Sequence, residues 1–353
     1  MPKVARTVEL GGPGPLTRKT MTLRNFRAFL TLVLAAMLCQ SAAAQTVLLN
    51  ASYDVSREFY KDINAAFVAQ YKKSSGKDMR VDQAHGGSSA QARAVNDGLE
   101  ADVVTMNTST DIDFLATNGV VAKDWTKRFP HNASPTSSTM LFLVRDKNPK
   151  GIKDWDDLTR PGIQVVVVNP KTGGNGRMAY LAAWGQVRKR GGTDAQAADF
   201  VAKLYKNVPV LAKGGRDATT IFLQRNLGDV LITFESEVVS IDREFGAGKV
   251  DAIHPSASIL AENPVAVVER TVAKKGTQDA AKAYLNFLYS DEGQEIAAQH
   301  AIRPSNPAIL KKYATTFKPI ALFTVEDYFG SPAEAQKVHF NDGGQFDRLY
   351  TVK

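Results

Sequence analysis

Cysteine is almost absent from this sequence: among 353 residues there is one, Cys39. It lies in the first 44 residues, which have the composition of a removable export segment. A mature chain without Cys39 has no disulfide, no thiolate nucleophile and no cysteine-based metal site. A lipoprotein would instead keep Cys39 and carry lipid on it, but that signal requires a small residue before the cysteine, and Leu38 stands there.

A large net charge is also missing once the first 44 residues are set aside. The whole chain has 44 Lys and Arg against 36 Asp and Glu, a formal charge of +8. Six of the basic residues and one of the acidic residues lie in the first 44, which leaves 38 against 35, or +3. Nucleic-acid binding uses a strong basic field, so we predict no nucleic-acid partner.

Motifs of nucleotide and metal chemistry are missing as well. The glycine-rich stretch at residues 169–177 (NPKTGGNGR) does not have the spacing of a P-loop, and no G-x-G-x-x-G follows a strand-like run. The five histidines show no paired spacing of the kind that binds zinc. We therefore predict no metal site and no cofactor.

The apolar run near the amino terminus is short. Residues 28–38 follow a basic stretch and precede Ala42-x-Ala44. A membrane span takes about 20 residues, whereas a shorter run between basic and small residues is typical of a secretory signal peptide. We predict that residues 1–44 are a signal peptide cleaved before Gln45, with an uncleaved anchoring helix as the alternative. The basic stretch is unusually long, so the start codon can be Met1 or Met21.

Beyond Gln45, strand-like apolar runs alternate with helical patterns. The predicted strands are residues 46–50, 79–84, 101–106, 139–144, 164–169, 230–233 and 264–268. Their Val, Ile and Leu content without strict alternation is typical of buried parallel strands. Strands that alternate with helices in this way predict an α/β fold with mostly parallel sheets covered by helices.

Ligands of such sheets bind at the carboxyl ends of the strands. Five turns follow predicted strands, at residues 52–54, 85–89, 169–177, 214–216 and 233–235. Three of them carry paired glycines just before a helix. Glycine allows close approach of the backbone, and a helix amino terminus presents unpaired N–H groups with partial positive charge. One such turn is more often only a tight turn, but three together favour an anion cradle.

Two other interpretations of these turns stay open. Lys171, Arg177 and Arg216 could pair with an anion, or they could brace the loops. The turn His85-Gly86-Gly87 is similar to the oxyanion-hole turn of esterases, with Ser88 as a nucleophile, although no G-x-S-x-G is present. A secreted serine hydrolase using Ser88 is therefore the alternative from another functional class.

Eight short segments, in this order, carry a family resemblance. They are SYD at 52–54, QAHGGSS at 83–89, NPKT at 169–172, GR with ATT at 215–220, GDVL at 228–231, FESE at 234–237, ILAE at 259–262 and EGQEIAA at 292–298. With them the chain resembles, from Leu48 to Leu349, the periplasmic sulfate- and thiosulfate-binding proteins of ABC importers.

This resemblance implies a two-lobed periplasmic binding protein fold of type II, in which two mostly parallel sheets flanked by helices are joined by a two-strand hinge. Lobe I would comprise residues 45–138 plus 264–353, and lobe II residues 139–263. The implied protein is a periplasmic monomer and not an enzyme. It would capture sulfate or thiosulfate between the lobes and deliver it to an ABC permease at the inner membrane.

The resemblance also implies that neutral donors hold the dianion. These would be the hydroxyl of Ser88 and the backbone N–H groups of Asp54, Ser88, Gly174, Asn175 and Gly215. A site made only of donors leaves the proton of phosphate unpaired, at a cost of about 1 to 3 kcal/mol.

Two positions depart from the sulfate-preferring pattern of that family. Gly173 stands where the family usually has Ser, and Phe234 stands where sulfate-type members have a Trp whose indole N–H reaches the anion. Both departures remove donors and enlarge the pocket. They favour thiosulfate, with sulfate as a shared ligand.

Overall fold

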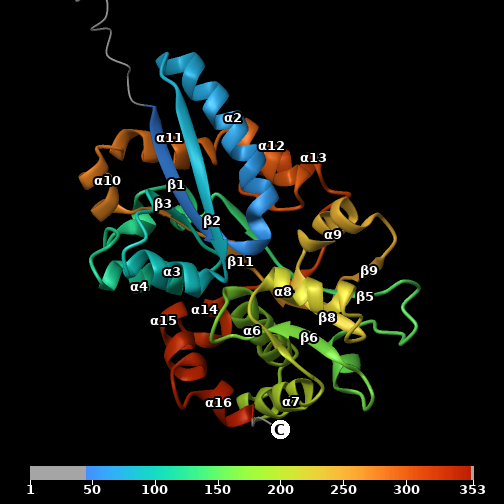
Figure 1. Ribbon diagram of the computed structural model, residues 1–353. Coiled ribbons are helices and arrows are strands. Elements are labelled where there is room, and N and C mark those ends of the chain that lie inside the picture. The colour runs from blue at the N-terminus through green and yellow to red at the C-terminus, as the bar shows by residue number, and fades with distance from the viewer. Residues whose placement is uncertain (1–44, 351–353) are drawn as a thin grey trace, which may run out of the picture. The chain divides into compact units, whose positions relative to one another are not determined.

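The computed structural model describes residues 45–350, so the predicted signal peptide lies outside the described residues. The described chain forms two larger sheets and two small ones. Figure 1 shows helices lying against the larger sheets. None of the helices in this described part is long and apolar enough to cross a membrane.

The first larger sheet has the strand order β12-β3-β1-β2. Its strands are β1 (Thr46–Tyr53), β2 (Met79–Gly86), β3 (Val103–Thr105) and β12 (Val265–Val267). β1 runs parallel to β2 and β3, and β12 is antiparallel to β3. The predicted strands of this region are therefore confirmed.

Successive side chains of a strand point to opposite faces of the sheet. The first sheet has buried apolar side chains on both faces, and helices cover both. Leu48 and Val103 share a hydrophobic core with α2 (Arg57–Ser75) and α11 (Gln278–Phe287). On the other face, Ala51 and Val104 pack with α3 (Ser88–Asn96) and α4 (Ser109–Thr117). We call this sheet with its helices the first sheet unit.

The second larger sheet has the order β7-β6-β8-β5-β9. Its strands are β5 (Met140–Arg145), β6 (Val165–Val168), β7 (Leu211–Ala212), β8 (Val230–Phe234) and β9 (Val250–Ile253). β6 is parallel to β7 and β8, but β5 is antiparallel to both of its neighbours. This sheet is thus mixed rather than mostly parallel, because β5 enters it directly from the segment that crosses over from the first sheet unit.

Helices also cover both faces of the second sheet. α6 (Gly174–Lys189) and α7 (Asp194–Lys206) bury one face, and α8 (Gly215–Thr219) and α9 (Glu237–Phe245) bury the other. We call this sheet with its helices the second sheet unit.

The chain crosses between the units through a small antiparallel sheet. β4 (Thr136–Ser138) pairs with β11 (Ala261–Asn263), and β13 (Arg303–Pro304) pairs with the other edge of β4. β4 leads into β5, and β11 precedes β12, so these two strands are the crossing pair that the family resemblance implied. The third strand, β13, was not predicted.

The carboxyl-terminal segment packs against the second sheet unit. β14 (Ala321–Phe323) pairs with β10 (Ala257–Ile259), and the helices α14 (Val325–Phe329), α15 (Pro332–Ala335) and α16 (Gln345–Leu349) follow. Figure 1 shows these helices, in red, beside α6 and α7, and Phe323, Phe340 and Phe346 lie in the core that those helices form. The lobe boundaries remain a proposal, but this packing favours assigning residues 321–350 to lobe II rather than to lobe I.

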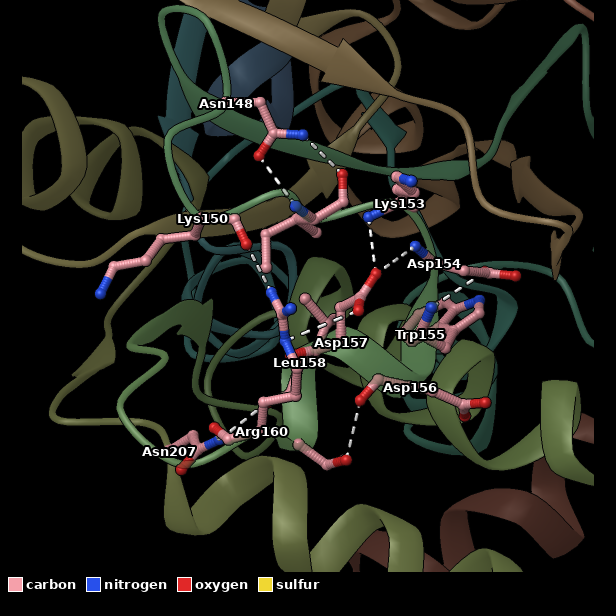
Figure 2. A network of polar contacts seen from close by, with 12 residues as sticks. Asn148, Lys150, Lys153, Asp154, Trp155, Asp156, Asp157, Leu158, Arg160 and Asn207 are labelled. Carbon is pink, nitrogen blue, oxygen red and sulfur yellow. Dashed lines mark hydrogen bonds and ion pairs between the residues drawn. The ribbon is translucent and has the colours of Figure 1, made fainter.

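Hydrogen bonds between side chains and backbone hold the long connection from β5 to β6, as Figure 2 shows. Asn148 exchanges two hydrogen bonds with the backbone of Ile152, at 2.7 and 2.9 Å. Asp157 accepts from the backbone N–H groups of the turn that precedes it, at 2.7 and 3.1 Å. Asn207, at the end of α7, donates to the carbonyl of Leu158 at 2.8 Å. These bonds fix the loop around one short 3-10 helix, η3 (Trp155–Thr159).

Candidate functional site

The three glycine-containing turns meet at one place, between the carboxyl edge of the first sheet and the amino termini of α6 and α8. A Cβ atom at Gly87, in the turn after β2, would lie 2.8 Å from the carbonyl oxygen of Thr172 and 3.2 Å from that of Lys213. Thr172 and Lys213 each precede a helix start by two residues. The absence of a side chain at Gly87 therefore lets the first turns of α3, α6 and α8 lie close together.

Ser88 is the first residue of α3 and is almost fully buried. Its hydroxyl donates a hydrogen bond to Oδ2 of Asp111, in the first turn of α4, at 2.5 Å. The hydroxyl thus faces the first turn of α4, where it has an acidic neighbour that no sequence pattern indicated.

Asp54 follows β1 and reaches across to the second sheet unit. Its Oδ2 accepts a hydrogen bond from the backbone N–H of Arg216, in the first turn of α8, at 3.1 Å. Burial raises the pKa of the Asp54 carboxyl, while the N–H groups of Arg216 and Gly215 lower it in part. A Cβ atom at Gly214 would lie 2.5 Å from this carboxylate, so the close approach requires glycine.

The amino terminus of α6 supplies further free donors. Gly173 precedes the helix with an extended backbone (φ −147°), and Gly174 and Asn175 are its first, buried residues. The first backbone hydrogen bond of the helix runs from the N–H of Arg177 to the carbonyl of Gly173. The N–H groups of Gly174 and Asn175 therefore have no partner within the helix.

Phe234 is the last residue of β8. It is buried, and its ring lies edge-on to that of Tyr53, with centroids 6.4 Å apart. Tyr53 directly precedes Asp54, so Phe234 is one side chain away from the site.

Lys171, Arg177 and Arg216, the three basic residues considered for pairing with an anion, each have a carboxylate partner. Arg177 pairs with Asp111 at 2.6 Å, Arg216 with Glu244 at 2.7 Å, and Lys171 with Asp347 at 2.9 Å. Of the two roles left open, bracing of loops is therefore the one that the contacts support.

A second acidic residue behind the site, Glu237, was also missed by sequence reasoning. It is fully buried at the start of α9 and accepts a hydrogen bond from the hydroxyl of Thr219 at 2.7 Å. Burial raises the pKa of Glu237 to about 7. The sequence signal was weak, because an acidic residue in the first turn of a helix is ordinary.

The hydrolase interpretation lacks a histidine base beside the nucleophile. Among the described residues, the Ser88 hydroxyl contacts Asp111 and the sulfur of Met106. The ring of His85 instead bonds the carbonyl of Tyr53 and the side chain of Gln83. Nor do the described His, Asp and Glu residues form a group of three or more that could hold a metal ion.

The comparison with known structures shows the fold. The sulfate-binding protein SubI from Mycobacterium tuberculosis superposes with a TM-score of 0.77 at 33% identity, over 84% of this chain and all of that one. A periplasmic thiamin-binding protein superposes with a TM-score of 0.65 at 18% identity, over 88% of this chain and 98% of that one, which supports the fold alone. The two-lobed periplasmic binding protein fold is thereby confirmed.

Sequence comparison gives the family. Residues 48–303 match the family of bacterial extracellular solute-binding proteins. A thiosulfate-binding protein from Pseudomonas aeruginosa is 53% identical, over 92% of this chain and 99% of its own length. A sulfate-binding protein from Escherichia coli is 47% identical, over 91% of this chain and 97% of its own length. These relatives are named as binding proteins, so the hydrolase alternative is not supported. The chain therefore belongs to the bacterial extracellular solute-binding proteins and, within them, to the family of the sulfate- and thiosulfate-binding proteins.

Proposed function

We propose that this protein captures sulfate or thiosulfate at the place where the three turns meet and delivers it to the permease of an ABC importer. The observation that carries the proposal is the convergence of three helix amino termini from both sheet units on one point, seen in the contacts of Gly87 with Thr172 and Lys213. Convergent N–H groups favour an anion. The paired state of Lys171, Arg177 and Arg216 favours a ligand that needs no counter-ion.

The proposed donors are the backbone N–H groups of Asp54, Ser88, Gly174, Asn175 and Gly215, together with the Ser88 hydroxyl. The N–H of Gly215 faces the Asp54 carboxylate, so that carboxylate must move aside when Gly215 donates to the anion. A hydroxyl has one proton, so Ser88 must turn from Asp111 to the anion when it donates. Asp111 then keeps its ion pair with Arg177. The absence of a hydroxyl at Gly173 and of an indole at Phe234 favours thiosulfate over sulfate.

Location and partners complete the proposal. Export through residues 1–44 would release a protein that begins at Gln45 in the periplasm, where it works as a monomer. The permease at the inner membrane would receive the anion.

Titration calorimetry of the mature protein with sulfate, thiosulfate, molybdate and phosphate tests the function. We expect binding of sulfate and thiosulfate and no turnover. The phosphate arm measures whether the carboxylate of Asp54 or Asp111, both beside the proposed donors, accepts the proton of that anion. Ser88→Ala should weaken binding about tenfold, at the low end for a hydrogen bond to a charged group, because the parent hydroxyl gives up its bond to Asp111. Unchanged affinity in S88A would show that the anion does not bind at Ser88. An absence of oxyanion binding in the parent would refute the function.

A further inference from the structure

Asn107 lies at the same edge of the first sheet as the proposed donors. In the parallel register, Ser52 of β1 pairs with Thr105 of β3 and with His85 of β2. Two residues further along each chain, Asp54, Asn107 and Gly87 leave the sheet at the same level. Asn107 therefore begins the third turn of this edge, beside the two turns already assigned to the site.

The side chain of Asn107 is buried against the amino terminus of α6. The residue is 3% exposed, and its Oδ1 has no hydrogen-bond partner among the described residues. This oxygen lies 2.0 Å from the position that a Cβ atom of Gly174 would occupy. The carboxamide thus contacts the first residue of the helix whose N–H groups are proposed to hold the anion.

An unpartnered buried carboxamide oxygen is unfavourable, so its position requires a reason. The partial positive charge of the α6 amino terminus favours the oxygen end of the amide on the Gly174 side. The amino end of a planar carboxamide then points away from the helix amino terminus, and Asn107 leaves the sheet beside the turns of Asp54 and Gly87. That end has two N–H donors and no acceptor, which suits an anion.

We propose that Asn107 is a ligand-contacting residue, whose side-chain amino group donates to the bound oxyanion from the first sheet unit. The inference rests on the proposed function, since it assigns one more donor to the same site. With Asn107, the turn after β3 also contributes a donor to the site; none of the other proposed donors lies in that turn.

Three variants test this role by calorimetry with sulfate and thiosulfate. Asn107→Ala removes the donor and should weaken binding about tenfold to a hundredfold. Asn107→Asp keeps the shape but places a carboxylate toward a dianion, so it should lose more affinity than N107A. Asn118→Asp adds the same charge at the exposed far end of α4 and should leave the affinity unchanged.

Two further measurements separate ligand contact from a structural role. Unfolding of N107A in anion-free buffer should match the parent, because the deleted oxygen has no partner to lose. In the parent, the side-chain ¹H–¹⁵N signals that disappear in N107A should shift when sulfate is added, whereas those of Asn64, which bonds Tyr284 in the first sheet unit, should not.

Opposite results overturn the assignment in distinguishable ways. If the parent binds sulfate or thiosulfate and N107A and N107D bind within about twofold of it, Asn107 only fills space over Gly174 and the inference is wrong. If N107A loses affinity only in proportion to lost stability, with no shift of the amide signals, the role is structural and the inference is again wrong. If the parent binds neither oxyanion, the proposed function fails first and the inference falls with it.

Discussion

At the scale of single residues, the turns of the candidate site lie close together because glycine has no Cβ atom. A Cβ atom at Gly215 would lie 2.4 Å from a methyl carbon of Val55, and one at Gly174 would overlap Asn107. Paired glycines in the sequence could be predicted as flexible turns. The contacts that these glycines allow between distant parts of the chain could not be predicted, because the contacting atoms belong to residues more than 60 positions away.

A buried histidine gives a prediction at the same scale. His339 packs among the rings of Tyr180, Trp184 and Phe329, and burial lowers the pKa of His339 to about 4. The unfolded chain takes up the proton near pH 6.5, so the folded state is favoured above that pH and loses this advantage as the pH falls from about 6.5 to about 4. The loss should amount to roughly 3 kcal/mol of unfolding free energy.

His339→Gln should remove that part of the acid sensitivity. Urea unfolding of parent and H339Q between pH 7 and pH 4 should show a smaller decline in the variant, whatever its stability at pH 7. His131→Gln, at an exposed position, is the matched control and should decline like the parent. Equal slopes for H339Q and the parent would mean that His339 takes up its proton without unfolding.

At the scale of the elements, the amino terminus of α6 decides whether a side chain can be added to the site. Gly173 has an extended backbone that any residue can adopt, and it occupies the cap position, where Ser is favoured. A Cβ atom there would meet a methyl group of Val168 at 3.0 Å, which a small shift of that side chain can relieve. A hydroxyl is therefore compatible with this helix start.

Gly173→Ser should raise the ratio of sulfate to thiosulfate affinity. The hydroxyl adds a donor to an oxygen of the dianion and should favour sulfate by about tenfold. Thiosulfate, with a larger and weaker-accepting sulfur, should gain less. Calorimetry of both anions on G173S and the parent measures the ratio, in which a general loosening of the loop cancels. A ratio that stays flat or moves toward thiosulfate would leave Phe234 as the remaining source of selectivity.

At the scale of the whole described chain, Arg177 ties together three distant segments. Its guanidinium pairs with Asp111 at 2.6 Å and donates to Ser89 of α3 and to Gln336, near the carboxyl terminus. Both charged side chains are less than 10% exposed. Removing one partner of a buried pair leaves an uncompensated charge, which costs more than the loss of the bond alone.

Asp111→Asn and Arg177→Gln should each lower the unfolding free energy by about 3 to 5 kcal/mol. The double variant should lose clearly less than the sum, because neither charge is then left alone. Urea unfolding of the four proteins measures the coupling. Asp78→Asn, which breaks the exposed pair with Lys72, is the control and should cost less than about 1 kcal/mol. Single variants that cost no more than D78N would show that solvent reaches the Arg177 pair.

The sequence by itself determined the local features of this protein. Hydrophobic runs predicted β1, β2, β5, β6 and β8, paired glycines predicted the helix starts, and eight matched segments indicated the family. These features depend on neighbours within one strand or one turn of a helix, where backbone geometry and side-chain size are sufficient to fix the structure.

Only the tertiary structure decided which distant groups meet. It paired Arg177 with Asp111 and Arg216 with Glu244, placed the carboxylate of Asp54 at the start of α8, and buried Asn107 against Gly174. It also packed residues 321–350 on the second sheet unit. The physical reason is that such contacts join residues far apart in the chain. The residues next to a charged or amide side chain in the sequence do not indicate which distant partner it will contact in the folded protein.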